Sequence, residues 1–290
     1  MIYSIRLRYC LVSLLFVSVP HVVLSGELEQ TIARSYEIRL IGDMQMNISN
    51  TKQHIKTETA LAYTWRGNSN KRQLYYDSFW VKALNGTQTI MDVYRDASKI
   101  VVVNKGKEDE VLYKDSPEDL RAEFDDSFRS PLATIALDDN GKVIERTNIG
   151  KPGAQALVQS GAISNALIFH PPFYGNKDSW TSPNEFSVGQ NKTMKGDLAY
   201  SKVRVENGLQ VVKVTGTFSE ENINLEGSPI TLTKAMYKIS GEQSYNLVKQ
   251  EWVAGKMLIK VTLEMGAGGK VIGNSAGTID ITFKQLPKTP

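Results

Sequence analysis

The fold is decided by the segment at residues 36–48, YEIRLIGDMQMNI. Its apolar side chains fall on even positions from Tyr36 to Ile48, and most odd positions carry a polar side chain. Successive side chains of a β-strand point to opposite faces, so a period of two indicates a strand with one buried face. The segment therefore predicts one long, half-buried β-strand.

The same alternation recurs along most of the chain. Residues 55–65 repeat it directly after the first segment, and residues 257–265 follow it strictly. Turn motifs such as Asn85-Gly86 and the DDNG motif at 138–141 separate several of these stretches. Further antiparallel strands are predicted at residues 73–84, 87–94, 99–103, 132–137, 142–146, 198–205, 209–218, 230–240, 245–253 and 278–283.

Glycine and acidic residues predict the remaining turns. Gly241 is expected to join two strands, and Ala254-Gly255 to lead into the next one. A glycine-rich loop is expected at residues 266–277, and the acidic run at 108–110 is expected to lie in a polar turn.

Two helices are predicted between the N-terminal and C-terminal strands. Ser116 is suited to cap the first helix and Pro117 to occupy its first position. Apolar residues then recur at helical spacing up to Phe128. The second helix is predicted at residues 152–166.

These elements predict a chain of the mainly β class. About ten or eleven strands are expected to form a large curved antiparallel sheet or an incomplete barrel, with the two helices packed on or in its mouth. Residues 26–290 are predicted to form a single β-rich domain, and a division near residue 130 or 190 is the alternative.

Residues 1–25 predict a secretory signal peptide. Arg6 and Arg8 precede a short apolar run at residues 11–19, and the small residue Ser25 precedes the expected cut. We expect no transmembrane segment after cleavage, because the apolar run is too short to span a bilayer.

Cysteine usage bears on the compartment. The single cysteine, Cys10, lies inside the predicted signal, so the mature chain has neither a disulfide nor thiolate chemistry. Export without cysteine favours a bacterial protein, located in the periplasm or outside the cell.

The charge of the chain is nearly balanced. It carries 34 Lys and Arg against 31 Asp and Glu, a formal charge of +3 that falls to about +1 without Arg6 and Arg8. The two signs are interspersed, so the composition does not favour a nucleic-acid partner.

Two glycine motifs resemble catalytic or phosphate-binding loops without their context. Residues 273–277 match G-x-S-x-G, but a strand rather than a helix is expected next and no histidine follows. Residues 266–270 lack the spacing of a phosphate loop. We therefore expect a non-enzymatic protein without a cofactor.

Histidines and acidic residues suggest no metal site. His54 falls on the polar side of its strand, and His170 precedes Pro171-Pro172, which predicts that His170 is a loop residue. A structural zinc site would need more ligands than these two. A carboxylate-dependent hydrolase of envelope polymers stays an alternative, because sequence does not show which acids meet.

The segment at residues 169–180 is rich in aromatic residues and proline. Its Phe173, Tyr174 and Trp180 are candidates for binding a ligand or a partner, although the favoured interpretation is that they plug the mouth of the sheet and complete the core. The aromatic residues Tyr63, Trp65 and Trp80 are candidates for lining a pocket in the concave face of the sheet.

In element order over residues 35–285, the chain resembles exported all-β proteins of bacterial envelopes whose function is unknown. It is also similar to half-barrel carriers of the periplasmic lipoprotein-carrier type, and no family-specific motif accompanies this likeness. The resemblance implies an exported binding protein for an apolar or amphiphilic ligand, such as a lipid, or for an envelope protein. The alternative is a structural or protein-interaction module that uses the aromatic segment 169–180.

Overall fold

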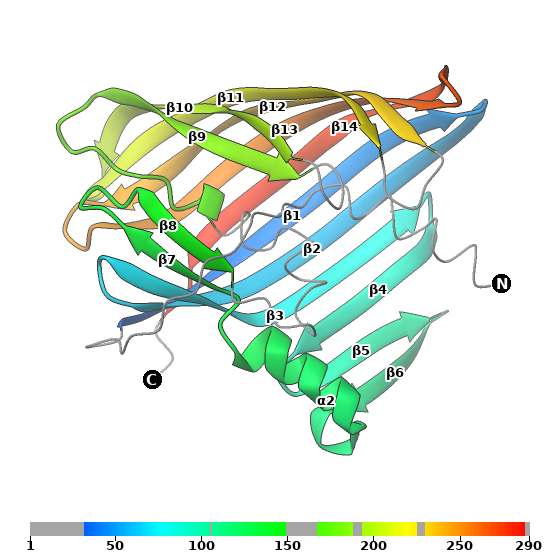
Figure 1. The fold of residues 1–290 in the computed structure, drawn as a ribbon, viewed down its shortest axis with the longest axis horizontal. Coiled ribbons are helices and arrows are strands. Elements are labelled where there is room, and N and C mark those ends of the chain that lie inside the picture. Colours follow the sequence, from blue (N-terminus) through cyan, green and yellow to red (C-terminus); the bar gives the residue numbers. More distant parts are fainter. Residues whose placement is uncertain (1–31, 105, 149–166, 188–192, 225–229, 288–290) are drawn as a thin grey trace.

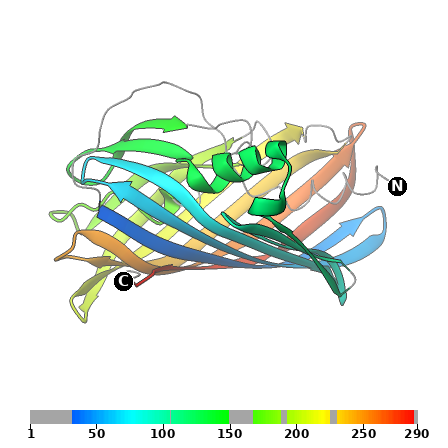
Figure 2. The same cartoon turned by 90° about the horizontal axis from the view of Figure 1, so that it is seen from below.

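A computed structural model describes residues 32–104, 106–148, 167–187, 193–224 and 230–287. The protein is mainly β, as predicted, and its strands form a large, curved, open antiparallel sheet (Figures 1 and 2). Its strands are β1 Ile32–Ile48, β2 Thr51–Gly67, β3 Lys71–Asn85, β4 Gln88–Asp96, β5 Lys99–Asn104, β6 Lys107–Leu112, β7 Ala133–Leu137, β8 Val143–Asn148, β9 Ser179–Ser187, β10 Thr193–Glu206, β11 Leu209–Asn224, β12 Thr231–Asn246, β13 Glu251–Ala267 and β14 Lys270–Gln285.

Strand order follows two meanders that meet in the middle of the sheet. The order is β6-β5-β4-β3-β2-β1-β14-β13-β12-β11-β10-β9, so β1 lies beside β14. Their antiparallel ladder runs from the pair Tyr36 and Gln285 to the pair Ile48 and Gly273. All other neighbours on this path follow one another in the sequence, so this ladder is where the two meanders pair with each other.

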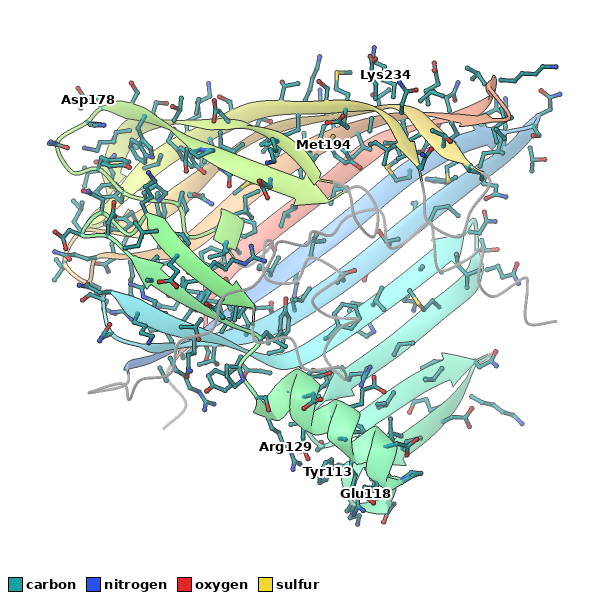
Figure 3. All side chains as sticks on the ribbon, viewed as in Figure 1. Tyr113, Glu118, Arg129, Asp178, Met194 and Lys234 are labelled. Carbon is teal, nitrogen blue, oxygen red and sulfur yellow. The ribbon has the colours of Figure 1, made fainter. Side chains whose placement is uncertain are left out.

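The alternation predicted for β1 is confirmed by burial. Tyr36, Ile38, Leu40 and Met46 are each less than 8% exposed, while the side chains between them face the other side of the sheet. The inward residues of β2, β13 and β14 join them in one hydrophobic core. The outer face carries charged residues such as Lys234, which projects from β12 (Figure 3).

Three turns predicted from glycine are wrong. Gly241 lies inside β12, Ala254-Gly255 lies inside β13, and most of the stretch 266–277 belongs to β13 and β14. The chain reverses instead between β12 and β13 at residues 247–250, and at Gly268-Gly269. Strands of 16 or 17 residues thus replace the shorter ones expected.

Close approach of neighbouring strands explains why glycine occupies these strand positions. A Cβ atom on Gly277 would overlap the carbonyl oxygen of Asp43 and lie 2.8 Å from the Cα of Met44 on β1. A Cβ atom on Gly241 would likewise overlap the carbonyl oxygen of Lys256 on β13. Glycine in a strand can mark such an approach of backbones rather than a turn.

Two edge strands were missed by the sequence patterns. The acidic run Glu108-Asp109-Glu110, predicted as a turn, lies in β6, where nearly every side chain is exposed. Trp180, predicted in a loop, lies in β9 and pairs with Tyr200 of β10. β6 is exposed on both faces and so has no alternation to detect, whereas in β9 the buried residues Trp180 and Ser182 alternate with exposed neighbours.

The first predicted helix is present as α2 Glu118–Phe124, followed by a π-helical turn, η3 Asp125–Arg129. Ser116 does not cap it, because its hydroxyl donates to the carbonyl of Leu112 and Pro117 takes the cap position. The preceding 3₁₀ turn, η2 Tyr113–Asp115, lies beside it, with the guanidinium of Arg129 3.7 Å from the centre of the Tyr113 ring (Figure 3). The second predicted helix, at 152–166, lies outside the described residues.

β3 has two partners along its length. Its second half pairs with β4, whereas its first residues pair with β7, from Lys71 opposite Ala136 to Leu74 opposite Ala133. β7 in turn pairs with β8. This branch places the β7–β8 hairpin beside the end of the sheet where β2 turns into β3 (Figure 1).

We predict that Gly277→Val destabilises the protein by about 1–3 kcal/mol, because the added side chain forces β1 and β14 apart. The free energy of unfolding, measured by urea denaturation, checks this. Ala276→Val is the matched control, since Ala276 is the exposed neighbour on the same strand. Equal stability of the two variants would contradict the close approach.

Candidate functional site

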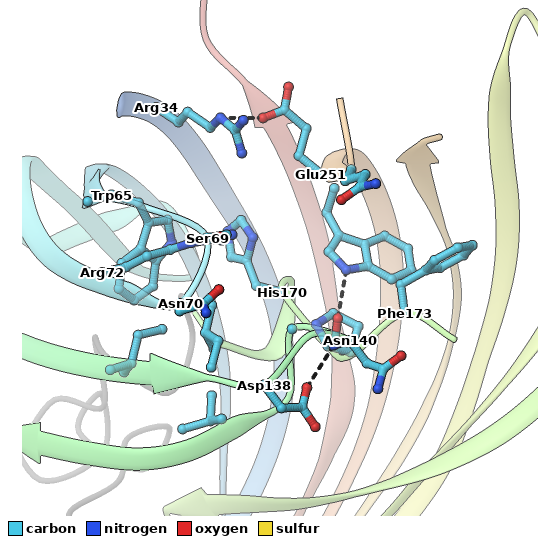
Figure 4. A pocket seen from close by; sticks show the side chains of 18 of the residues that line it. Arg34, Trp65, Ser69, Asn70, Arg72, Asp138, Asn140, His170, Phe173 and Glu251 are labelled. Atoms are coloured by element: carbon cyan, nitrogen blue, oxygen red, sulfur yellow. Dashed lines mark hydrogen bonds and ion pairs between the residues drawn. The ribbon is translucent and has the colours of Figure 1, made fainter. Parts of the chain in front are cut away.

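A cavity of about 370 Å³ lies at one end of the sheet (Figure 4). It is bounded by the start of β1, the β2–β3 turn, the β7–β8 turn, the segment after residue 166 and the β12–β13 turn. The residues that line it are Arg34, Tyr36, Trp65, Gly67, Asn68, Ser69, Asn70, Arg72, Ile135, Leu137, Asp138, Asp139, Asn140, Gly141, Val143, Leu167, His170, Pro171, Phe173, Tyr245, Lys249, Gln250, Glu251 and Trp252.

Hydrogen bonds within two turns hold the rim of this cavity in place. The carboxamide oxygen of Asn68 accepts the backbone N–H groups of Asn70 and Lys71, which fixes the β2–β3 turn. The Asp138 carboxylate does the same for Asn140 and Lys142 in the β7–β8 turn. Such Asx turns are typical of tight reversals, so two walls of the cavity are positioned by local hydrogen bonds.

The segment at residues 167–174 plugs the sheet next to the cavity. Its His170 ring lies among aromatic rings of three strands, 4.7 Å from Tyr36, 6.0 Å from Trp65 and 5.3 Å from Phe283 between ring centres. The Tyr63 hydroxyl and His170 Nε2 are 3.0 Å apart and form a hydrogen bond. His170 is thus a core residue as well as a turn residue.

Backbone atoms of the same segment are also bonded. The indole N–H of Trp252 donates to the carbonyl of Pro171 at 2.8 Å, and the N–H of Phe173 donates to the carbonyl of Asn140 at 2.8 Å. The Phe173 ring stacks on Tyr245 with ring centres 3.9 Å apart. The segment therefore joins the β7–β8 turn to the start of β13.

The three aromatic candidates of segment 169–180 pack inward to different degrees. Trp180 is buried and stacks on Tyr200 at 5.4 Å, while Phe173 and Tyr174 are half-buried against the core. Of the three, only Phe173 lines the cavity.

The three candidates from the sheet do not share one pocket. Trp65 lines the cavity, and Tyr63 is buried behind His170. Trp80 lies on the opposite face, because it pairs with Ala60 and its indole N–H donates to Asp92 at 3.0 Å.

A bulge in β3 explains the position of Trp80. Ala62 pairs with Ser78 but Tyr63 pairs with Tyr76, so Asp77 is an extra residue. The extra residue reverses the alternation after it. Even-numbered residues of β3 face inward before the bulge, and odd-numbered residues face inward beyond it.

Three cationic side chains, Arg34, Arg72 and Lys249, and three carboxylates, Asp138, Asp139 and Glu251, line the cavity. Figure 4 shows Arg34, Arg72, Asp138 and Glu251. Arg34 Nε lies 2.6 Å from Glu251 Oε2, in a contact that is electrostatic rather than a well-aligned hydrogen bond. Arg72 Nε donates to the carbonyl of Asn68 at 3.3 Å. Burial lowers the pKa of Arg72 somewhat, and the charge of Arg34 adds to this effect.

The protonation states of the cavity wall follow from burial. Burial lowers the pKa of His170 well below its ordinary value of 6.5, and the charges of Arg72 and Arg34 lower it further. His170 is therefore neutral at neutral pH. Burial and the charge of Glu251 raise the pKa of Tyr36 to about 12, so its phenol also stays protonated.

Other residues singled out in the sequence lie away from this cavity. Ser275 of the G-x-S-x-G motif is buried within β14, and a strand surrounds it where a nucleophile would need a sharp turn before a helix. His54 Nε2 lies 2.6 Å from Asp43 Oδ1 on the outer face. Among the described residues, no group of three His, Cys, Asp or Glu is arranged to hold a metal ion.

Sequence reasoning missed the charged and polar part of the site. Arg34, Arg72 and Glu251 stand at strand ends, where charged residues are ordinary on any surface. Only the strand order, which brings β1, β3 and β13 to one end of the sheet, shows that they meet.

We predict that His170 makes the fold sensitive to acid. Because the folded protein keeps His170 neutral below pH 6.5 while the unfolded chain takes up a proton, the free energy of unfolding falls as the pH drops below 6.5, by up to about 1.4 kcal/mol per pH unit. Urea denaturation between pH 7.5 and 5.0 should show a steeper loss for the wild type than for His170→Phe. Parallel curves would contradict the buried neutral imidazole.

Within the part of the chain that the structure describes, no helix is both long enough and apolar enough to cross a bilayer.

No family model matches the chain, and no curated protein matches its sequence. A lipovitellin structure, described as "Lipid-protein interactions in lipovitellin", covers 89% of this chain at 7% identity with a TM-score of 0.47. This chain spans only 25% of the length of that lipovitellin chain. Pseudomonas aeruginosa OpdQ and OpdL cover 89% and 88% of this chain, and 99% and 98% of their own, at 7% identity with TM-scores of 0.22 and 0.18. At these values the likenesses identify neither a family nor a function for this chain.

Proposed function

We propose that this chain is an exported binding protein that holds a compact amphiphilic small molecule in the cavity beside His170. The observation that carries this proposal is the composition of the cavity wall, where aromatic rings and charged groups face one space. Ligand sites are typically apolar clefts with a few convergent polar groups.

The size of the cavity limits the ligand. About 370 Å³ is at the lower end of the range of roughly 300–1,000 Å³ that small-molecule sites span. It corresponds to the volume of on the order of a dozen water molecules. A molecule of two or three aromatic rings, or a short chain with a head group, would fit, and a whole diacyl lipid would not.

The aromatic wall supplies the apolar side of the site. Trp65, Phe173, Tyr245 and Trp252 line the cavity, and each is held by neighbours rather than free to collapse into it. Rigid aromatic side chains offer large contact area at a low entropic cost. This preorganisation supports binding without rearrangement of the sheet.

We infer that the site binds rather than catalyses, because its two least exposed acids are already engaged. Glu251 is paired with Arg34, and the Asp138 carboxylate accepts two N–H groups of its own turn. Burial raises the pKa of Asp77, but that residue lies outside the cavity and its carboxylate accepts the hydroxyl of Thr64. A hydrolase would need a second acid opposite one with a raised pKa.

The alternative of a protein-interaction module has less support. The aromatic segment 169–180 buries Phe169 and Trp180 and half-buries Phe173. Little aromatic surface is left for a partner, and this favours the cavity over the segment as the binding element.

Binding of the neutral fluorescent probe N-phenyl-1-naphthylamine tests the proposal. We expect saturable binding to the wild-type protein, and an affinity about tenfold or more lower for Ser69→Trp, because an indole at the rim fills the cavity. Fluorescence titration measures both affinities.

The matched control is Thr87→Trp, which places the same side chain in the exposed β3–β4 turn, away from the cavity. It should bind the probe as the wild type does. Absence of saturable binding, or equal affinities for the two tryptophan variants, would contradict the proposal.

A further inference from the structure

Arg72 is the one guanidinium of the cavity wall whose charge is not matched by a carboxylate of the described residues. Its Nε donates to the backbone carbonyl of Asn68, and it forms no ion pair with any side chain that the structure describes. Arg34, in contrast, lies against Glu251, which is only 6% exposed. A partly buried, unmatched guanidinium is costly unless an anion compensates it.

The charge balance around Arg72 is positive. The ionised groups that act on it are Arg34, which opposes its charge, and Glu251, which favours it. The aromatic hydroxyls of Tyr36 and Tyr245 stay protonated at neutral pH, because burial raises the pKa of both. Arg34 and Arg72 against Glu251 leave an excess of one positive charge on this side of the cavity, while Asp138, Asp139 and Lys249 line the other side.

The carboxylates that the structure describes in the opposite wall form no ion pair with Arg72. Asp138 lies across the cavity, on the β7–β8 turn, and its carboxylate accepts the N–H groups of Asn140 and Lys142 (Figure 4). Asp139 and Lys249 are both exposed and carry opposite charges. The positive charge of Arg72 is therefore available to a ligand.

A second unused donor lies in the same wall. The indole N–H of Trp65 is buried and has no acceptor among the described residues. Buried donors are nearly always paired in proteins. Arg72 and Trp65 therefore place two donor groups with spare hydrogen-bonding capacity in one wall.

We propose that the cavity recognises the anionic group of its ligand, a carboxylate, phosphate or sulfonate, and that Arg72 is the residue that binds it. This inference rests on the function proposed above. The planar guanidinium fork suits a two-oxygen anion and gives charge-assisted hydrogen bonds. The rings of Phe173, Tyr245 and Trp252 then hold the apolar part of the same molecule.

Two probes that differ by one sulfonate test this assignment. 8-Anilino-1-naphthalenesulfonate carries the anionic group, and N-phenyl-1-naphthylamine has the same ring system without it. We expect the wild type to prefer the anionic probe, and Arg72→Met to lower the affinity for that probe about tenfold or more. The affinity for the neutral probe should change less than about threefold.

Lys71→Met is the matched control, because it removes one positive charge from the adjacent residue of β3, which faces away from the cavity. It should leave the preference for the anionic probe unchanged. Arg72→Lys keeps the charge without the fork and should give an intermediate preference. Thermal denaturation of each variant shows that the sheet is folded, and Arg72→Lys carries the test if Arg72→Met does not fold.

Competition separates a free anion from an amphiphile. Displacement of the anionic probe by octyl phosphate but not by inorganic phosphate identifies an amphiphile with an anionic head group, and displacement by both identifies a site for the anion itself. The assignment is overturned if both probes bind and Arg72→Met weakens them equally or neither of them. Failure of both probes to bind would instead overturn the proposed function.

Discussion

The antiparallel ladder between β1 and β14 is the interaction on which the rest of the structure depends. It pairs residues from opposite ends of the described chain, such as Ile38 with Phe283, and joins two meanders that would otherwise have no shared edge. Closing so long a loop costs conformational entropy before any contact is gained. The small residues along this seam, Gly277 above all, let the two backbones approach closely enough to offset that cost.

The cavity inherits its walls from this ladder. Arg34 and Tyr36 come from β1, and Glu251 comes from β13 on the far side of the seam. Phe283 of β14 packs against His170, which lines the cavity. The segment around His170 contacts both meanders. The Tyr63 hydroxyl forms a hydrogen bond with His170, and the indole N–H of Trp252 donates to the carbonyl of Pro171. A site built this way exists only when the sheet is complete, since Arg34 and Arg72 come from one meander and Glu251 comes from the other.

The sequence was most informative where one face of a strand is buried. Strict alternation predicted β1, β2 and the centre of β13, and the spacing of Phe124 and Phe128 predicted the helical turn after residue 117. Glycine was misleading, because Gly241 and Gly277 serve close packing of strands rather than turns. The edge strand β6 had no alternation to reveal it, since both of its faces are exposed.

The candidate site was predictable only in part, for similar physical reasons. The aromatic segment 169–180 drew attention by composition, and its Phe173 does line the cavity. The orientation of Trp80 depended on the extra residue Asp77, which no local pattern marks. The pairing of Arg34 with Glu251 depended on strand order, which is a property of the whole chain rather than of either segment.

The separation of β1 and β14 in the sequence has a consequence for the order of events during synthesis. β1 emerges before its partner β14 by the length of all the strands described between them. At roughly 5–20 residues per second, β1 waits on the order of tens of seconds with one edge unpaired. During that interval the edge is open to other strands, including those of neighbouring chains. Pairing of β14 with β1 therefore closes this edge of β1 late, and the time before that step is when β1 most needs shielding from aggregation.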